Sequence, residues 1–216
     1  MTKLTILILS LSLFSGCSFK SPPNQWQYKS TNAFNSYTKN FLSAHDILAK
    51  NDFKRAVAHA KVTADLRSLA KIYLGECALN ISVGIEDECL KYQNISPTLK
   101  SQSLQAYYSL LTLNLNTQAI ESLPSNYQNF ATNLLNTEYE KANQELQNID
   151  KATSKILAGA LLKEHIDELS IRDIIKVSSL HGYKKSVLYW LERLKNVTKD
   201  TNEIVIINKK IEVINE

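Results

Sequence analysis

Two cysteines, Cys77 and Cys89, are the residues best placed for covalent chemistry in the body of this 216-residue chain. An apolar stripe at helical spacing runs up to Cys77, and the segment 82–84 then reads as a turn in which Gly84 is free to take a left-handed conformation. Cys77 lies six residues before Val83 and Cys89 six residues after it, so the two come level in an antiparallel hairpin. This register predicts a disulfide, whose loop closure contributes about 3 kcal/mol. Two buried free thiols are the alternative, because two lone cysteines are too few for a metal site.

The other residues that could do chemistry carry no recognisable catalytic spacing. The four histidines form no H-E-x-x-H pattern, the cysteines are not spaced as C-x-x-C, and no G-x-S-x-G, Walker-type or G-x-G-x-x-G motif occurs. His165 lies among charged residues, which is more typical of a solvated helix end than of a metal ligand. We therefore expect no enzymatic activity, no cofactor and no metal. An enzyme would need an acidic residue in a cleft, and Glu76, Glu164 and Glu168 are present without a motif to mark them.

The third cysteine, Cys17, follows a segment typical of protein export. A lone cation at Lys3 precedes an apolar run from Leu4 to Phe14, and the small residues Ser15 and Gly16 come next. The run spans about 11 residues, whereas a membrane-spanning helix needs about 20. The pattern therefore favours a signal peptide over a permanent span.

The order Leu13-Phe14-Ser15-Gly16-Cys17 resembles the lipobox of bacterial lipoproteins. The resemblance implies cleavage after Gly16 and attachment of several acyl chains, such as palmitate, at Cys17, which anchors a protein stably. Ser18, in place of aspartate, resembles lipoproteins sorted to the outer membrane with their domain facing the periplasm; the inner membrane and the cell surface are alternatives. An ordinary signal peptide or an uncleaved N-terminal anchor is the other interpretation. Export also supplies the oxidising compartment that a disulfide requires.

Composition indicates helices after this leader. The chain is 44% hydrophobic and 21% charged, and it holds only five Gly and four Pro, so few tight turns are available for a β-sandwich. The net charge of +4 is spread among interspersed Lys and Glu, which predicts no nucleic-acid partner. We expect a signal peptide over 1–16, a lipidated N-terminus and flexible tether over 17–32, and a helical-repeat domain over 33–216.

Apolar residues recur in pairs of helical stripes separated by short breaks, which predicts antiparallel helix hairpins. The breaks lie at Lys50–Asp52, Ser82–Gly84, Asn114–Asn116, Asn136–Glu138 and His181–Gly182. Expected helix starts lie at Ile85, at Ser96-Pro97 and at Ser170 as an N-cap. The tail repeats Ile204, Ile207, Ile211 and Ile214, which favours a capping helix over a strand.

Three turns share one form. The segments 51–56, 137–142 and 181–186 each hold an aromatic residue followed three positions later by a small one. This resembles the centre of a tetratricopeptide repeat, where the aromatic fills the pocket between paired helices. The resemblance implies an all-α, right-handed stack of about five antiparallel hairpins plus a C-terminal capping helix. The repeat spacing is irregular, and an unrelated helical bundle is the alternative.

The adjacent pair Tyr107-Tyr108 cannot point inward with both rings, so one of them is a candidate anchor for a partner; packing on the next hairpin is the alternative. Stacked hairpins form a concave surface that docks a partner segment. Together with the lipobox, this predicts a membrane-anchored scaffold or adaptor in the bacterial cell envelope, in an assembly, secretion or pilus-type complex. Its partners would be the membrane, through the lipid, and an envelope protein. A peptidoglycan-acting enzyme on an α-solenoid and a purely structural envelope protein are the alternatives.

Overall fold

The structure, a computed structural model, describes residues 24–216. Every regular element in this range is a helix, which confirms the all-α prediction. The expected signal peptide over 1–16, Cys17 and the first part of the expected tether lie outside the described residues. The helices are, in chain order, α2 (Gln25–Leu42), α3 (Asp46–Ala60), α4 (Arg67–Ser82), α5 (Leu90–Gln93), η2 (Ser96–Thr98), α6 (Gln102–Leu111), α7 (Thr117–Glu121), α8 (Ser125–Leu135), α9 (Tyr139–Gln147), α10 (Ala152–Leu161), η3 (Lys163–His165), α11 (Glu168–Leu180), α12 (Lys184–Val197) and α13 (Thr201–Asn215).

The helical domain begins earlier than the expected boundary at residue 33, because α2 starts at Gln25. Residues 25–32, predicted as tether, form its first turns. The buried side of this stretch consists of small residues: Ser30 is buried and its Oγ donates to the carbonyl of Ala56 at 2.9 Å. Tyr28 points outward and is 69% exposed. Because Ser30 is buried and Trp26 half-buried within 25–32, no apolar period marks the start of this helix.

The first hairpin turns at Ser43–His45 and not at the predicted break over Lys50–Asp52, which lies inside α3. Asp52 is buried in the hairpin, where its carboxylate accepts from Asn40 Nδ2 and from Arg55 Nη2, each at 2.7 Å. A polar residue such as Asp52 looks like part of a turn in the sequence, although in the structure it is buried and bonded to residues of two helices. The prediction of a turn motif at 51–56 is wrong for this reason.

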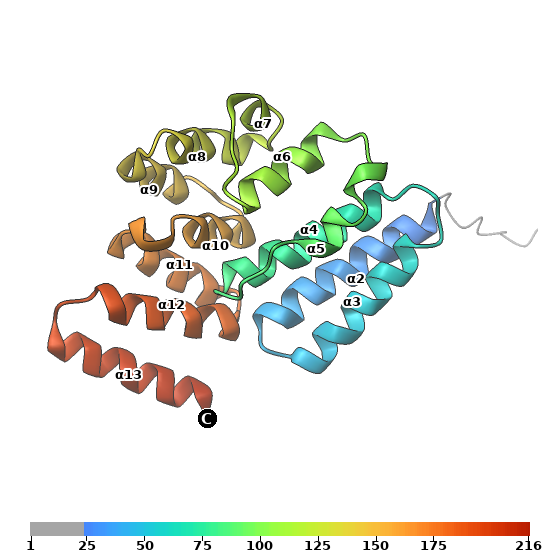
Figure 1. The fold of residues 1–216 in the computed structure, drawn as a ribbon. Coiled ribbons are helices and arrows are strands. Elements are labelled where there is room, and N and C mark those ends of the chain that lie inside the picture. Colours follow the sequence, from blue (N-terminus) through green and yellow to red (C-terminus); the bar gives the residue numbers. More distant parts are fainter. Residues whose placement is uncertain (1–23) are drawn as a thin grey trace, which may run out of the picture.

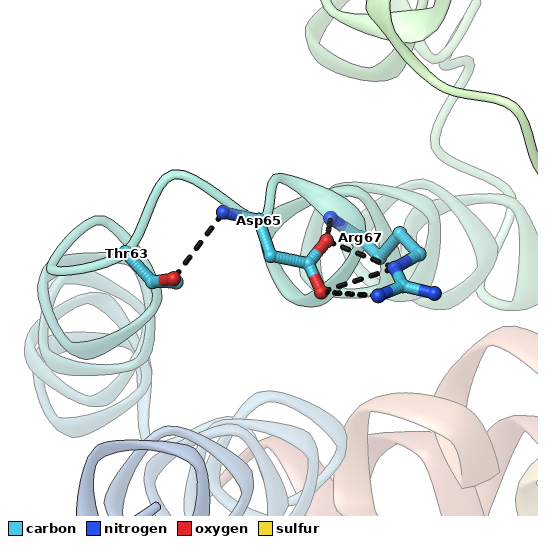
Figure 2. Close-up of polar contacts among 3 residues, drawn as sticks. All are labelled: Thr63, Asp65 and Arg67. Atoms are coloured by element: carbon cyan, nitrogen blue, oxygen red, sulfur yellow. Dashed lines mark hydrogen bonds and ion pairs between the residues drawn. The ribbon is translucent and has the colours of Figure 1, made fainter.

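The connection from α3 to α4 is held by side chains at the start of α4 (Figure 2). Asp65 accepts from the backbone N–H of Arg67 at 3.0 Å and from its Nη2 at 2.7 Å, while the Thr63 hydroxyl accepts from the Asp65 backbone at 3.2 Å. The hydrogen bonds from Arg67 lower the pKa of Asp65 to about 2. Because Asp65 and Arg67 lie at the surface, we assign the cluster a local role in shaping the turn.

α4 ends at Ser82, and Gly84 follows with a φ of 75°, as the predicted turn requires. The expected return helix from Ile85 is absent; the chain runs irregularly to Cys89 and forms only the single turn of α5. The cause is Asp87, whose carboxylate accepts from Asn80 Nδ2 and from the Cys89 backbone N–H, each at 2.7 Å. These bonds tie the segment to the end of α4 in place of a helix.

The later turns agree better with the sequence. The breaks at 114–116, 136–138 and 181–182 each separate two helices, and the isoleucine-rich tail forms α13. Two starts differ from the prediction. Ser96 and Pro97 open only the short η2, and the N-cap of α11 is Asp167, which accepts from the Ser170 backbone at 2.7 Å. Ser170 is itself fully buried inside the first turn of α11.

α4 and α10 lie side by side at the centre of the molecule (Figure 1). From α4 the chain passes through α6 to α9 along one side and returns to α10, and α11 to α13 follow on the other. α12 also contacts α2, and Lys185 Nζ of α12 donates to Asp46, the first residue of α3, at 2.6 Å. In a linear array each repeat contacts only its neighbours. Here helices far apart in sequence also touch. Helices from α4 to α13 share a large buried cluster around Tyr92, Phe130 and Trp190, whereas α2 and α3 contribute to two smaller clusters with α4.

Candidate functional site: a groove between α2 and α10

A groove of about 800 Å³ lies between α2 and α10, and we call it the α2–α10 groove. Phe34, Asn35, Thr38 and Lys39 of α2 form one wall, and the first turn of α8 and the α9–α10 connection form the other. α4 and α10 supply the floor. A volume of this size falls within the range of sites that hold small molecules or short segments of a partner.

The wall next to α4 depends on Gly75. A Cβ at this position would collide with the ring of Phe34, so the missing side chain allows α2 to lie close over α4. Ala78 beside it is also small and buried. The floor is therefore shaped by small residues that keep the groove open, while Leu79 and Leu157 make it apolar.

Two tyrosines from different helices close one part of the groove. The rings of Tyr107 and Tyr127 lie 6.2 Å apart, and the Tyr127 hydroxyl donates to the carbonyl of Ser154 at 3.4 Å. Burial raises the pKa of Tyr127 to about 12 and that of Tyr107 well above its usual value. The Tyr127 hydroxyl is engaged with the Ser154 carbonyl, so this pair closes the groove mainly with its aromatic rings.

The two predicted partner-binding residues separate in the structure. Tyr107 lines the groove, whereas Tyr108 packs on Tyr92 with ring centroids 5.2 Å apart. Adjacent residues on a helix point in different directions, which explains the split. Tyr107 is half-buried and is the member of the pair available to a ligand in the groove.

The rim of the groove is polar and carries charge of both signs. The amides of Asn35, Asn126 and Asn148 make no side-chain hydrogen bond with any other part of residues 24–216. Each such amide offers donors and an acceptor. Lys39 and Lys151 outnumber Asp150, so the ionisable residues at the rim carry net positive charge.

Cys77 and Cys89 are joined, with their Cα atoms 5.3 Å apart, in agreement with the predicted pairing. Both residues are buried, and Asp87 lies close enough to the two sulfurs for the three to form a metal-ligand group. With the sulfurs in a disulfide the thiolates that such a site needs are not available. The expected return helix does not form. The two cysteines are nevertheless close, because the Asp87 hydrogen bonds hold Cys89 against α4.

The other residues singled out in the sequence lie apart from one another. His165 stacks on Tyr139 at 3.6 Å between ring centroids, outside the α2–α10 groove. Glu164 is exposed, and Glu168 pairs with Arg172. Glu76 alone is largely covered: burial raises its pKa, while an ion pair with Lys91 acts in the opposite direction. It lines a separate cavity of about 470 Å³ beside Asp87 and Cys89.

Comparison with protein families, with curated proteins and with solved structures finds no match for this chain. Within residues 24–216, no helix combines the length and the apolar character that crossing a membrane requires.

The sequence identified one residue of the groove, Tyr107, and missed the rest. Residues that line it run from Phe34 to Tyr183 and come from several helices. No local spacing marks such a set, since only the packing of α2 and of α10 against α4 brings its members together. The unpaired asparagines would have been a usable signal only with the fold already known.

Proposed function

We propose that this chain is a membrane-anchored lipoprotein of the bacterial cell envelope. In this proposal it acts as a scaffold or adaptor in an assembly, secretion or pilus-type complex and holds a segment of a partner protein in the α2–α10 groove. The anchor would be lipid at Cys17, placing the domain on the periplasmic side of the outer membrane. The helix hairpins would be a divergent tetratricopeptide-like array. Two of its three turn motifs, at 137–142 and 181–186, lie where one helix ends and the next begins.

The α2–α10 groove carries this proposal. Its aromatic side chains offer apolar contact, its unpaired amides offer hydrogen bonds to a peptide backbone, and its walls come from well-packed helices. Binding in a preformed groove loses little conformational freedom on the side of the scaffold.

Photo-crosslinking in intact membranes tests the docking role. A photo-crosslinking amino acid at position 35, on the groove wall, should capture a discrete partner. The same amino acid at position 208, exposed on α13, serves as the control. Equal capture from both positions, or none from position 35, would contradict docking in the groove.

Membrane fractionation tests the anchor separately. Cys17→Ala should release the protein from the membrane fraction, because the acyl attachment site is lost. If the variant remains in the membrane fraction as the unaltered protein does, lipid anchoring at Cys17 is wrong.

A second candidate function rests on Glu76, a carboxyl group with a raised pKa in a cavity, as expected of a catalytic acid. The reaction class would be glycoside cleavage in peptidoglycan. Purified protein should then release soluble fragments from peptidoglycan, and Glu76→Gln should abolish the release. No release by the unaltered protein rules this candidate out.

A further inference from the structure

The first turns of α8 and α10 meet at the α2–α10 groove. Both helices begin without a side-chain cap, at Pro124 and at Lys151, and neither has an acidic residue in its first turn. The Tyr127 hydroxyl, bonded to the Ser154 carbonyl, joins the two turns. Helix N-termini carry partial positive charge, so two of them side by side favour an anion.

The donors at the start of α10 lack acceptors. Within residues 24–216, no acceptor is bonded to the backbone N–H groups of Ala152, Thr153 and Ser154. These are the donors that a helix leaves unsatisfied at its N-terminus. Thr153 and Ser154 both line the groove, so a ligand there can reach this turn.

Ser154 gives independent evidence for a ligand at this point. The residue is only 8% exposed, yet its Oγ makes no hydrogen bond with any other described residue. The Oγ atom is not fully enclosed and keeps contact with the solvent of the groove. A hydroxyl that lines a groove without a partner is available to an acceptor that enters from outside.

Charge at the rim favours the same kind of ligand. Apart from tyrosines, the ionisable residues that line the groove are two lysines, Lys39 and Lys151, and one aspartate, Asp150, so their net charge is positive. The groove, at about 800 Å³, is much larger than a single anion needs. The unpaired amides of Asn35, Asn126 and Asn148 supply the further donors and acceptors that an extended backbone requires.

We infer that the groove binds an acidic, extended polypeptide segment and that one of its carboxylates docks at the N-terminus of α10, where it accepts hydrogen bonds from Ser154 Oγ and the backbone N–H groups of the first turn. The inference rests on the proposed docking function and adds to it the chemistry of the partner. The carboxylate is that of a glutamate or aspartate side chain or that of a chain end.

Fluorescence anisotropy with the full chain in detergent tests this inference. The probes are a labelled, C-terminally amidated peptide of alternating glutamate and serine, the same peptide with glutamine, and the glutamine peptide with a free C-terminal carboxylate. The glutamate peptide should bind at least about tenfold more tightly than the amidated glutamine peptide, less so at high salt. Tight binding of the third probe as well would assign the site to a chain end.

Substitutions that alter the site without disrupting the fold provide a second test. Thr153→Asp puts a carboxylate in the first turn of α10, where it favours the helix but repels the ligand, and should weaken binding about tenfold. Asn202→Asp, in the first turn of α13 away from the groove, is the matched control and should leave binding unchanged. Ser154→Ala should weaken binding several-fold, and Asp150→Asn should strengthen it.

Equal binding of the glutamate and glutamine peptides, or unchanged binding by Thr153→Asp, would overturn the inference. So would binding of a labelled neutral peptidoglycan oligosaccharide where neither peptide binds. The outcome is separable from that of the proposed function: crosslinking of a partner at position 35 with no preference for acidic peptides leaves docking intact and removes only the carboxylate site.

Discussion

Gly159 shows how one missing side chain sets the spacing between helices. It lies in α10 and is buried under residues of α11, of α12 and of the connection between α10 and α11. A Cβ at this position would collide with Ile174 Cδ1 and would come within 3.0 Å of the Trp190 ring. The close approach of these side chains is therefore possible only over a glycine.

We expect Gly159→Ala to lower the free energy of unfolding by about 1 to 2 kcal/mol, because overpacking costs more than the helix propensity gained. Urea denaturation measures the change. Adding Ile174→Val removes the colliding Cδ1, so the double variant should lose less stability than the two single losses added together. Strict additivity would contradict the close contact.

Tyr127, which lines the groove, should make the free energy of unfolding depend on pH in alkaline solution. Burial raises its pKa to about 12, whereas an unfolded tyrosine ionises near pH 10. Between these values the native state keeps the proton and the unfolded state loses it, so stability falls as pH rises through this window and is unaffected below it.

The expected loss from Tyr127 is roughly 1.4 kcal/mol for each pH unit inside the window. Urea unfolding at a series of pH values between 9 and 12 checks it. Tyr127→Phe should unfold with a shallower pH dependence, although Tyr107 and Tyr37, whose pKa values burial also raises, keep part of it. An unchanged slope would show that Tyr127 ionises normally in the native protein.

Among the secondary-structure elements, the segment between α4 and α6 owes its conformation to hydrogen bonds and a disulfide. Asp87 ties it to Asn80, and Cys89 ties it to Cys77, so α5 stays a single turn. Cys89 has a φ of 56°, a left-handed conformation that a non-glycine residue adopts at a cost. The links hold a backbone that helix formation would not produce.

The double variant Cys77→Ser, Cys89→Ser should lose about 3 kcal/mol of unfolding free energy, since a loop with a sequence separation of 12 is no longer closed in the unfolded chain. Chemical denaturation gives the value. A reducing agent should lower the stability of the unaltered protein by a similar amount and leave the double variant unchanged. Free thiols in protein purified without a reducing agent would contradict the pairing.

At the scale of the whole molecule, the contacts of α4 with α10 and of α2 with α12 join early and late parts of the chain. α13 packs mainly on α12, with a further ion pair from Glu203 to Arg172 of α11. α2 is therefore held by later parts of the chain, whereas α13 is held from one side.

Hydrogen exchange should follow this asymmetry. We expect the slowest amide exchange in α4 and α10, intermediate exchange in α2, and the fastest among the long helices in α13. A linear array would lose protection alike at both ends. Mass spectrometry of exchanged peptides distinguishes the two patterns, and equal protection of α2 and α13 would argue against the role of the α2–α12 contact.

Local patterns in the sequence predicted the helical class, most of the later turns and the pairing of Cys77 with Cys89, although the return helix from which the pairing was argued does not form. Periodic apolar residues and turn residues act over short distances, so they can be recognised without knowledge of the fold. The same local reasoning failed at Asp52 and Asp87, because each carboxylate finds partners that only the folded chain supplies.

The tertiary structure alone decided the groove. Phe34, Ser154 and Tyr183 become neighbours because α2 packs on α4 at Gly75 and α10 returns to α4 after a long excursion. The unpaired donors at the start of α10 are likewise a property of the fold, since a helix N-terminus becomes a binding site only where packing leaves it open to a ligand.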